Sequence, residues 1–139
     1  MPTTICFDFG ILLNRVPSGT PVALPFSMVG WNFTGAPVGM QAILMNSPSL
    51  GRGLEFPASF FIDLPVPSAK INMIIGQGGG PITVQFKDAA LVPIAGGVVT
   101  NSPGASMGYG FRLRRRAKRV TFTGGSNEGV LIELCITFS

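Results

Sequence analysis

Two segments decide the fold of this chain: Thr3-Thr4-Ile5-Cys6-Phe7-Asp8-Phe9 and Leu131-Ile132-Glu133-Leu134-Cys135-Ile136-Thr137-Phe138. Both alternate apolar and mixed positions with the period of two that is typical of a half-buried strand. If they pair antiparallel with residue numbers that sum to 141, both faces match. One face pairs Ile5 with Ile136, Phe7 with Leu134 and Phe9 with Ile132; the other pairs Cys6 with Cys135 and Asp8 with Glu133. The sequence therefore predicts a β-sandwich whose first and last strands are neighbours.

The rest of the chain also predicts strands. Its 139 residues suffice for one domain with its own hydrophobic core, and we expect a single domain over residues 1–139. No apolar stripe has helical spacing, whereas 19 glycines and 12 prolines separate short alternating segments. We expect strands at about residues 3–9, 25–33, 40–46, 53–56, 59–64, 70–76, 81–88, 91–99, 106–114, 118–123 and 129–138. Such a pattern is typical of an all-β sandwich or barrel.

The composition is poor in charge: 12% of the residues are charged and 46% are hydrophobic. A soluble protein of this kind needs a surface of Ser, Thr, Asn and Gly, or an oligomer that hides apolar surface, and we expect both. No apolar run reaches the roughly 18–20 residues of a membrane helix. Met1 does not open a signal peptide, so the sequence leaves open whether the protein stays in the cytoplasm or has lost a leader.

Catalytic groups are scarce. The chain has no histidine, which removes Ser-His-Asp and Cys-His catalysis and the commonest zinc ligand. We therefore expect that the protein is not an enzyme; only Asp8, Glu128 and Glu133 could act as a general acid or base. The two cysteines fit one disulfide or two reduced thiols. The demanding geometry of a disulfide across adjacent antiparallel strands favours free thiols.

Four segments from about residue 55 onward form a familiar pattern: Phe60-Phe61-Ile62-Asp63-Leu64-Pro65, Ile71-Asn72-Met73-Ile74-Ile75-Gly76-Gln77, Gly80-Pro81-Ile82-Thr83-Val84-Gln85-Phe86-Lys87-Asp88-Ala89 and Arg119-Val120-Thr121-Phe122-Thr123-Gly124-Gly125-Ser126-Asn127-Glu128-Gly129-Val130-Leu131-Ile132. With the first strand, this pattern resembles the galactose-binding-like jelly-roll modules of bacterial surface proteins, including many that exosortase sorts. The resemblance implies a jelly-roll β-sandwich of two antiparallel sheets, an extracellular location and a binding or adhesive role. The chain departs from the pattern at residues 10–13, where acidic residues are usual, and no sorting tail follows Phe138.

The facing carboxylates of Asp8 and Glu133 would repel each other across the strands, and one of them would have a raised pKa. A calcium ion between them would remove the repulsion. Modules of the resembled kind often hold a structural calcium near the first and last strands, so Asp8 and Glu133 are our candidate metal ligands. The alternatives are a register shifted by two and side chains that both reach solvent.

A basic segment lies at residues 112–119, which hold six of the ten cationic residues: Arg112, Arg114, Arg115, Arg116, Lys118 and Arg119. As a functional site, the segment would bind an anion, such as an acidic polysaccharide, a lipid headgroup or a nucleic acid backbone. As a purely structural feature, it would be a solvated hairpin tip that protects an edge strand, and the sequence favours this interpretation. The sequence shows neither the interleaved aromatic residues nor the groove-reading helix that would support nucleic acid binding.

Three residues are candidates for contact with a carbohydrate. Tyr109 lies between two glycines, where it could stand exposed and stack on a sugar ring. Asn127 and Glu128 lie in the loop 124–129, the most distinctive part of the resemblance; Glu128 could accept hydrogen bonds from sugar hydroxyls, although a role in shaping the loop is favoured. Trp31 is expected in the core.

The strand pattern, the resemblance and the lack of catalytic groups favour a non-enzymatic binding or adhesion module that recognises carbohydrate. The alternative is a self-assembling, coat-like subunit. It would hide its apolar surface in the assembly and turn the basic segment toward nucleic acid or another anion.

Overall fold

A computed structural model describes residues 2–9, 17–35, 41–47, 51–77, 80–99, 105–124 and 129–138. The described chain is nearly all β, as the sequence predicts. Its eleven strands are β1 (Thr3–Asp8), β2 (Pro21–Ala23), β3 (Phe26–Met28), β4 (Trp31–Gly35), β5 (Gln41–Ser47), β6 (Gly51–Phe56), β7 (Ser59–Gln77), β8 (Ile82–Lys87), β9 (Pro93–Val99), β10 (Ala105–Gly124) and β11 (Gly129–Phe138). Among these residues, no helix has the length and apolar character that crossing a bilayer would require.

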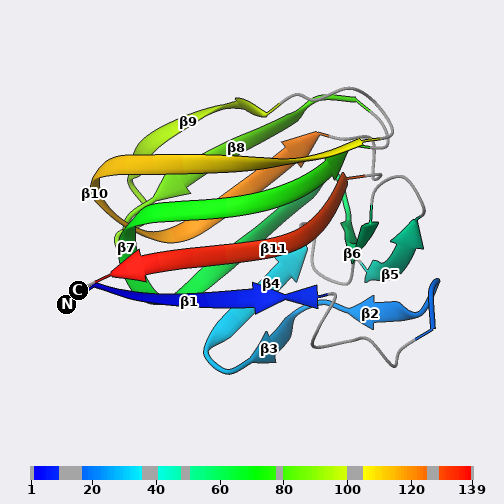
Figure 1. The fold of residues 1–139 in the computed structure, drawn as a ribbon. Coiled ribbons are helices and arrows are strands. Elements are labelled where there is room, and N and C mark those ends of the chain that lie inside the picture. Colours follow the sequence, from blue (N-terminus) through cyan, green and yellow to red (C-terminus); the bar gives the residue numbers. More distant parts are fainter. Residues whose placement is uncertain are drawn as a thin grey trace.

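The strands form the two layers of a sandwich because β7 and β10 bend together and contribute to both (Figure 1). In the first layer, residues 60–63 of β7 pair with β4, and residues 59–63 pair with the end of β10. The end of β10 also pairs with β8, which pairs with β9. In the second layer, residues 70–77 of β7 pair with β11 and with the start of β10. We call these the β8 layer and the β11 layer. All pairs of strands are antiparallel in the described chain, and the hydrogen-bonded ladder continues from one layer into the other.

The first and last strands are neighbours, as the sequence predicts. β1 pairs antiparallel with β11 from Thr3–Phe138 to Asp8–Glu133, in the predicted register. On the same side of β11, opposite β7, its first residues pair with β6, which continues into β5 and β2. The β11 layer therefore contains both termini, side by side at one edge of the sandwich (Figure 1).

The predicted pair of Phe9 with Ile132 is not part of this ladder. The β1–β11 ladder ends at Asp8, and a register shift between Leu131 and Glu133 leaves Ile132 in a bulge. Phe9 instead packs in the core, with its ring centroid 4.7 Å from that of Phe7.

The two cysteines form a disulfide between Cys6 and Cys135, so the expectation of free thiols is wrong. The two residues are direct partners in the β1–β11 register, with Cα atoms 4.0 Å apart. Because alternation turns both side chains to the same face, the two sulfurs lie within bonding distance of each other. The bond links residues 129 positions apart in sequence and ties the first strand to the last.

Two predicted turns are bends within single strands. The segments 59–64 and 70–76 belong to one strand, β7, and the segments 106–114 and 118–123 belong to one strand, β10. The pairing of β7 with β10 shifts register at this point: residues 113–116 of β10 stand against residue 69 alone, and residues 64–67 of β7 stand against residue 118 alone. Pro65 and Pro67, which have no N–H to donate, fall in the unpaired stretch of β7.

Aromatic residues dominate the core between the layers. Seven of the eleven phenylalanines are less than 2% exposed: Phe7, Phe9, Phe33, Phe56, Phe60, Phe86 and Phe122. Trp31 is also buried, as expected, with its ring edge-on to Phe7. Across the sandwich, Phe56 of the β11 layer stacks on Phe60 and lies tilted against Phe122 of the β8 layer, so burial of flat apolar surface holds the layers together.

Candidate functional site

Uncharged polar side chains gather on the outer face of the β8 layer. Val84, Phe86 and Phe122 point into the core and are fully buried. Alternation along β8 and β10 therefore turns their sequence neighbours, Thr83, Gln85, Thr121 and Thr123, toward the opposite face.

Register brings these four side chains together. Thr121 of β10 is opposite Gln85 of β8, and Thr123 is opposite Thr83. They surround a depression of about 400 Å³, which we call the threonine groove; its lining is Thr83, Val84, Gln85, Gly96, Thr121 and Thr123. No residue in this lining carries a formal charge, so the groove suits a neutral ligand with many hydroxyl groups.

The groove has a bare backbone wall and a buried hydroxyl. Gly96 of β9 faces Gln85, and a Cβ atom at this position would lie 2.9 Å from the carbonyl oxygen of Val84. Only glycine therefore leaves this wall as it is. The hydroxyl oxygen of Thr121 is buried and has no hydrogen-bond partner among the described residues. An unsatisfied hydroxyl costs about 1–3 kcal/mol, so a partner for it would stabilise this face.

Phe61 of β7 borders the groove, because it is the partner of Thr121 on the other side of β10. The guanidinium carbon of Arg119 lies 3.9 Å from the centroid of its ring. Arg119 also donates two hydrogen bonds to Asp63, with Nε–Oδ1 at 2.7 Å and an Nη–Oδ2 distance of 3.2 Å. The two-point ion pair fixes the arginine over the ring and makes a rigid edge for the groove.

The basic segment is not a hairpin tip, so that interpretation is wrong. Residues 112–119 run through the middle of β10, at the bend between the layers. The extra β10 residues of the register shift direct neighbouring cationic side chains to different places.

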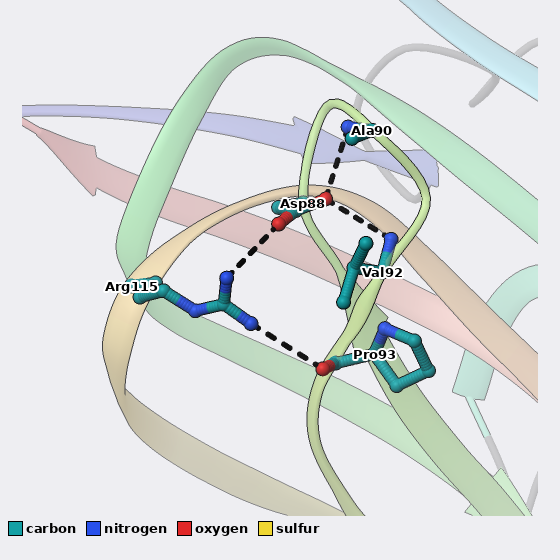
Figure 2. A network of polar contacts seen from close by, with 5 residues as sticks. All are labelled: Asp88, Ala90, Val92, Pro93 and Arg115. Atoms are coloured by element: carbon teal, nitrogen blue, oxygen red, sulfur yellow. Dashed lines mark hydrogen bonds and ion pairs between the residues drawn. The ribbon is translucent and has the colours of Figure 1, made fainter.

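Arg115 is directed to the β8–β9 turn, as Figure 2 shows. Its guanidinium donates to the Asp88 carboxylate at 3.2 Å and reaches the Pro93 carbonyl oxygen at 3.5 Å. The other carboxylate oxygen of Asp88 accepts the backbone N–H groups of Ala90 and Val92 at 2.9 and 3.0 Å. Arg115 thus ties the bend to a turn, and its charge is balanced within the protein.

Lys118 and Arg119 are likewise engaged within the protein. Lys118 donates to the carbonyl oxygen of Leu64 across the bend, and Arg119 holds Asp63 as described above. Arg112, Arg114 and Arg116 are all exposed, and of these Arg112 and Arg116 line a second depression, at the bend itself. Of the six predicted anion-binding residues, Arg112 and Arg116 are therefore the ones that the structure brings together around a pocket.

Asp8 and Glu133 are cross-strand partners, as predicted. Burial, a hydrogen bond to Asp8 and the charge of Asp8 raise the pKa of Glu133, in that order of importance. A shared proton between the two carboxyl groups relieves their repulsion.

The described residues make an incomplete calcium site. The sulfur of Cys135 lies 3.5 Å from Glu133 Oε1, but it belongs to the disulfide and supplies no oxygen ligand. Calcium takes six to eight oxygen ligands, and two carboxylates supply only part of such a shell. The calcium site at Asp8 and Glu133 stays a prediction.

Of the three residues predicted to contact a sugar, one lies away from the groove and the other two are not among the described residues. Tyr109 is half-buried and packs against the core opposite Met73, so the exposed platform predicted for it is wrong. Alternation along β10 turns it inward, because its partner Met73 is buried. Asn127 and Glu128 lie outside the described residues.

The groove residues were missed because they are neighbours only through strand register. The sequence does show that Thr83 and Gln85 alternate with buried residues on β8. It does not show that Thr121 and Thr123 stand next to them, since 35 or more residues lie between the two pairs in sequence. A count of uncharged polar residues on outward positions of each strand is the signal that would find them.

In solved structures, the fold is similar to that of family 29 carbohydrate-binding modules. One such module, from Piromyces equi, matches with a TM-score of 0.56 and 8% identity over 99% of this chain and 91% of that chain. Two mutants of family 29 modules match with TM-scores of 0.54 and 0.53, at 8% identity, over 99% of this chain and 92% and 86% of theirs. No family model and no curated protein matches the sequence. The likeness agrees with the predicted jelly-roll sandwich, while sorting to a bacterial surface stays a prediction.

Proposed function

We propose that this protein is a non-enzymatic carbohydrate-binding module whose threonine groove holds a neutral part of a polysaccharide. The observation that carries the proposal is the strand register that gathers Thr83, Gln85, Thr121 and Thr123 around one depression. Hydroxyl and amide groups both donate and accept, as sugar hydroxyls do, so each can hydrogen-bond to the ligand in either sense.

The surroundings of the groove support a sugar as its ligand. Beside Thr121, the Arg119 guanidinium stacked on the Phe61 ring makes a planar edge, which suits the flat face and the hydroxyl groups of a sugar ring. The groove is an open depression on a sheet face, so a long chain can cross it without threading. The similarity in fold to family 29 carbohydrate-binding modules adds to this support.

Calorimetry against soluble neutral polysaccharides (galactomannan, glucomannan, xyloglucan and mixed-linkage glucan) tests the proposal. We expect Gln85→Ala and Thr123→Val each to weaken binding about 2- to 10-fold, the effect of one lost neutral hydrogen bond. Thr3→Val makes the same Thr-to-Val change at an exposed position of β1 and is expected to leave affinity unchanged. Absence of binding to every polysaccharide of the panel would contradict the proposal. Equal effects of Thr123→Val and Thr3→Val would move the site away from the groove.

The coat-like subunit remains the alternative function. Size-exclusion chromatography with light scattering separates the two, because a coat-like subunit assembles with rising concentration. A monomer at high concentration excludes self-assembly and leaves the binding module.

A further inference from the structure

A second depression, of about 320 Å³, lies where β7 and β10 bend from one layer to the other, beside the end of β11. We call it the bend pocket. Three cationic side chains, Lys70, Arg112 and Arg116, are in its lining, together with Ser68, Thr137 and Phe138. None of the described residues in its lining is acidic.

Two of these cations face each other directly. Arg112 of β10 is the register partner of Lys70 of β7. Like charges at directly opposite cross-strand positions destabilise a sheet. Neither residue, nor Arg116, forms an ion pair with another described residue; the ion pairs of this region are those of Arg115 and Arg119. An anion placed among the three side chains would replace this repulsion with attraction.

Hydrogen bonds of Ser68 hold the backbone beneath these side chains in place before any ligand binds. Ser68 is 1% exposed, and its hydroxyl donates to the carbonyl oxygen of Thr137 at 2.6 Å. The Ser68 hydroxyl oxygen in turn accepts the N–H group of Lys70 at 3.3 Å. Ser68 thereby ties the bend of β7 to β11 and sets the position from which Lys70 extends. A site held by a buried side chain loses little entropy when a ligand binds.

We propose that the bend pocket binds the anionic group of an acidic polysaccharide, a sulfate ester or a carboxylate. The inference rests on the proposed carbohydrate-binding function and adds a charged subsite to it. The planar guanidinium groups of Arg112 and Arg116 match two oxygens of such an anion, and Lys70 adds a point charge. A nucleic acid is disfavoured because base binding needs an exposed aromatic platform, and Phe138, the aromatic residue of the pocket, packs partly against the core.

The test uses calorimetry with a sulfated galactan, the same galactan after desulfation, and polygalacturonate, each at low and high salt. The double variant Arg112→Gln/Arg116→Gln is compared with Arg114→Gln/Lys87→Gln, which removes the same charge from residues that do not line the pocket. We expect the first variant to weaken binding of the acidic ligand at least about tenfold, as charge-assisted hydrogen bonds are lost, and to flatten its salt dependence. The control should stay within about twofold of wild type. Thermal unfolding of both variants verifies that they fold.

The outcomes separate this inference from the proposed function. Losses of equal size in the two variants, or equal affinity for a single-stranded polynucleotide, overturn the bend pocket as a glycan subsite. Binding of neutral polysaccharides with no response to either acidic one overturns this inference alone, whereas binding of no polysaccharide overturns both. Preference for the sulfated galactan or for polygalacturonate identifies the anionic group.

Discussion

Two pairs of like charges face each other across strands of the β11 layer, and they differ in how their repulsion can be relieved. Asp8 and Glu133 are partners in the β1–β11 ladder, and Lys70 and Arg112 are partners in the β7–β10 ladder. A carboxyl pair can relieve its repulsion internally by keeping one proton, and the pKa of Glu133 is raised by burial and by Asp8. A guanidinium group cannot give up its proton. Lys70 and Arg112 form no ion pair with another described residue, so an anion from outside would neutralise the basic pair.

Within the basic segment, some cations are neutralised by carboxylates of the protein and others are not. Arg115 and Arg119 are neutralised by Asp88 and Asp63, which belong to neighbouring strands and turns. Arg112 lies only a few positions away and has no such carboxylate among the described residues. Location relative to the bend, rather than the number of arginines, decides which cations are available to a ligand.

The largest expected effect comes from removing the disulfide beside the acidic pair. Cys6→Ser/Cys135→Ser releases a cross-link between residues 129 positions apart. We expect the free energy of unfolding to fall by about 2–5 kcal/mol, measured by urea denaturation. Affinity for the sulfated galactan should not change, because the basic pair belongs to another ladder. A loss below about 1 kcal/mol would contradict the cross-link's role.

A matched pair of Arg-to-Gln changes sharpens the contrast within the basic segment. Arg119→Gln removes two hydrogen bonds to Asp63 and the contact with Phe61, and we expect it to lower the free energy of unfolding by about 1–2 kcal/mol. Arg112→Gln removes a charge that faces Lys70, so stability should be unchanged or raised, by less than about 0.5 kcal/mol. Chemical denaturation at low salt measures both. Equal losses in the two variants would mean that Arg112 is as firmly engaged as Arg119.

The smallest expected effect is a pH dependence from the acidic pair. Because the pKa of Glu133 is raised from 4.5 in the folded state, the folded protein holds more protons than the unfolded chain above that pH. The contribution of Glu133 to stability is thus fully present below pH 4.5 and is lost as the pH rises through the raised pKa. Melting temperatures from pH 3 to 7 should show this fall in the wild type, and Glu133→Gln should remove it. A wild-type-minus-variant difference that rises with pH contradicts the shared proton.

The same experiment separates a shared proton from bound calcium. If calcium binds Asp8 and Glu133, a chelator lowers the melting temperature, added calcium restores it, and Asp8→Asn abolishes the response. If a proton alone links the pair, the chelator has no effect and the pH dependence persists.

The sequence predicted the parts of the fold that depend on alternation. The register of residues 3–8 against 133–138 is correct because apolar residues match on one face and fix the pairing to within one residue. It also predicted the buried role of Trp31 and the nearness of Asp8 to Glu133. The disulfide was not predicted because its geometry across adjacent antiparallel strands is demanding, and register alone does not show whether the thiols are oxidised.

Local sequence patterns could not predict the bend or the two candidate sites. Pro65 and Pro67 indicate an interruption in pairing, but a turn and a bend within one strand interrupt it equally. For the same reason, the sequence of residues 112–116 does not distinguish a solvated hairpin tip from a bend within a strand. The threonine groove and the bend pocket each combine residues from three strands or more, so only the assembled register brings them together.

The pairing of the two ends has a mechanical consequence. A pull on both termini peels β1 from β11 one rung at a time, since Thr3 and Phe138 are partners at the same end of the ladder. Three rungs open, through Ile5–Ile136, before tension reaches the bond between Cys6 and Cys135. From that point the covalent bond bears the load, and the chain between the two cysteines, with the groove and most of the bend pocket, is shielded from extension. The domain would resist stretching through its ends in an oxidising environment and lose that resistance on reduction.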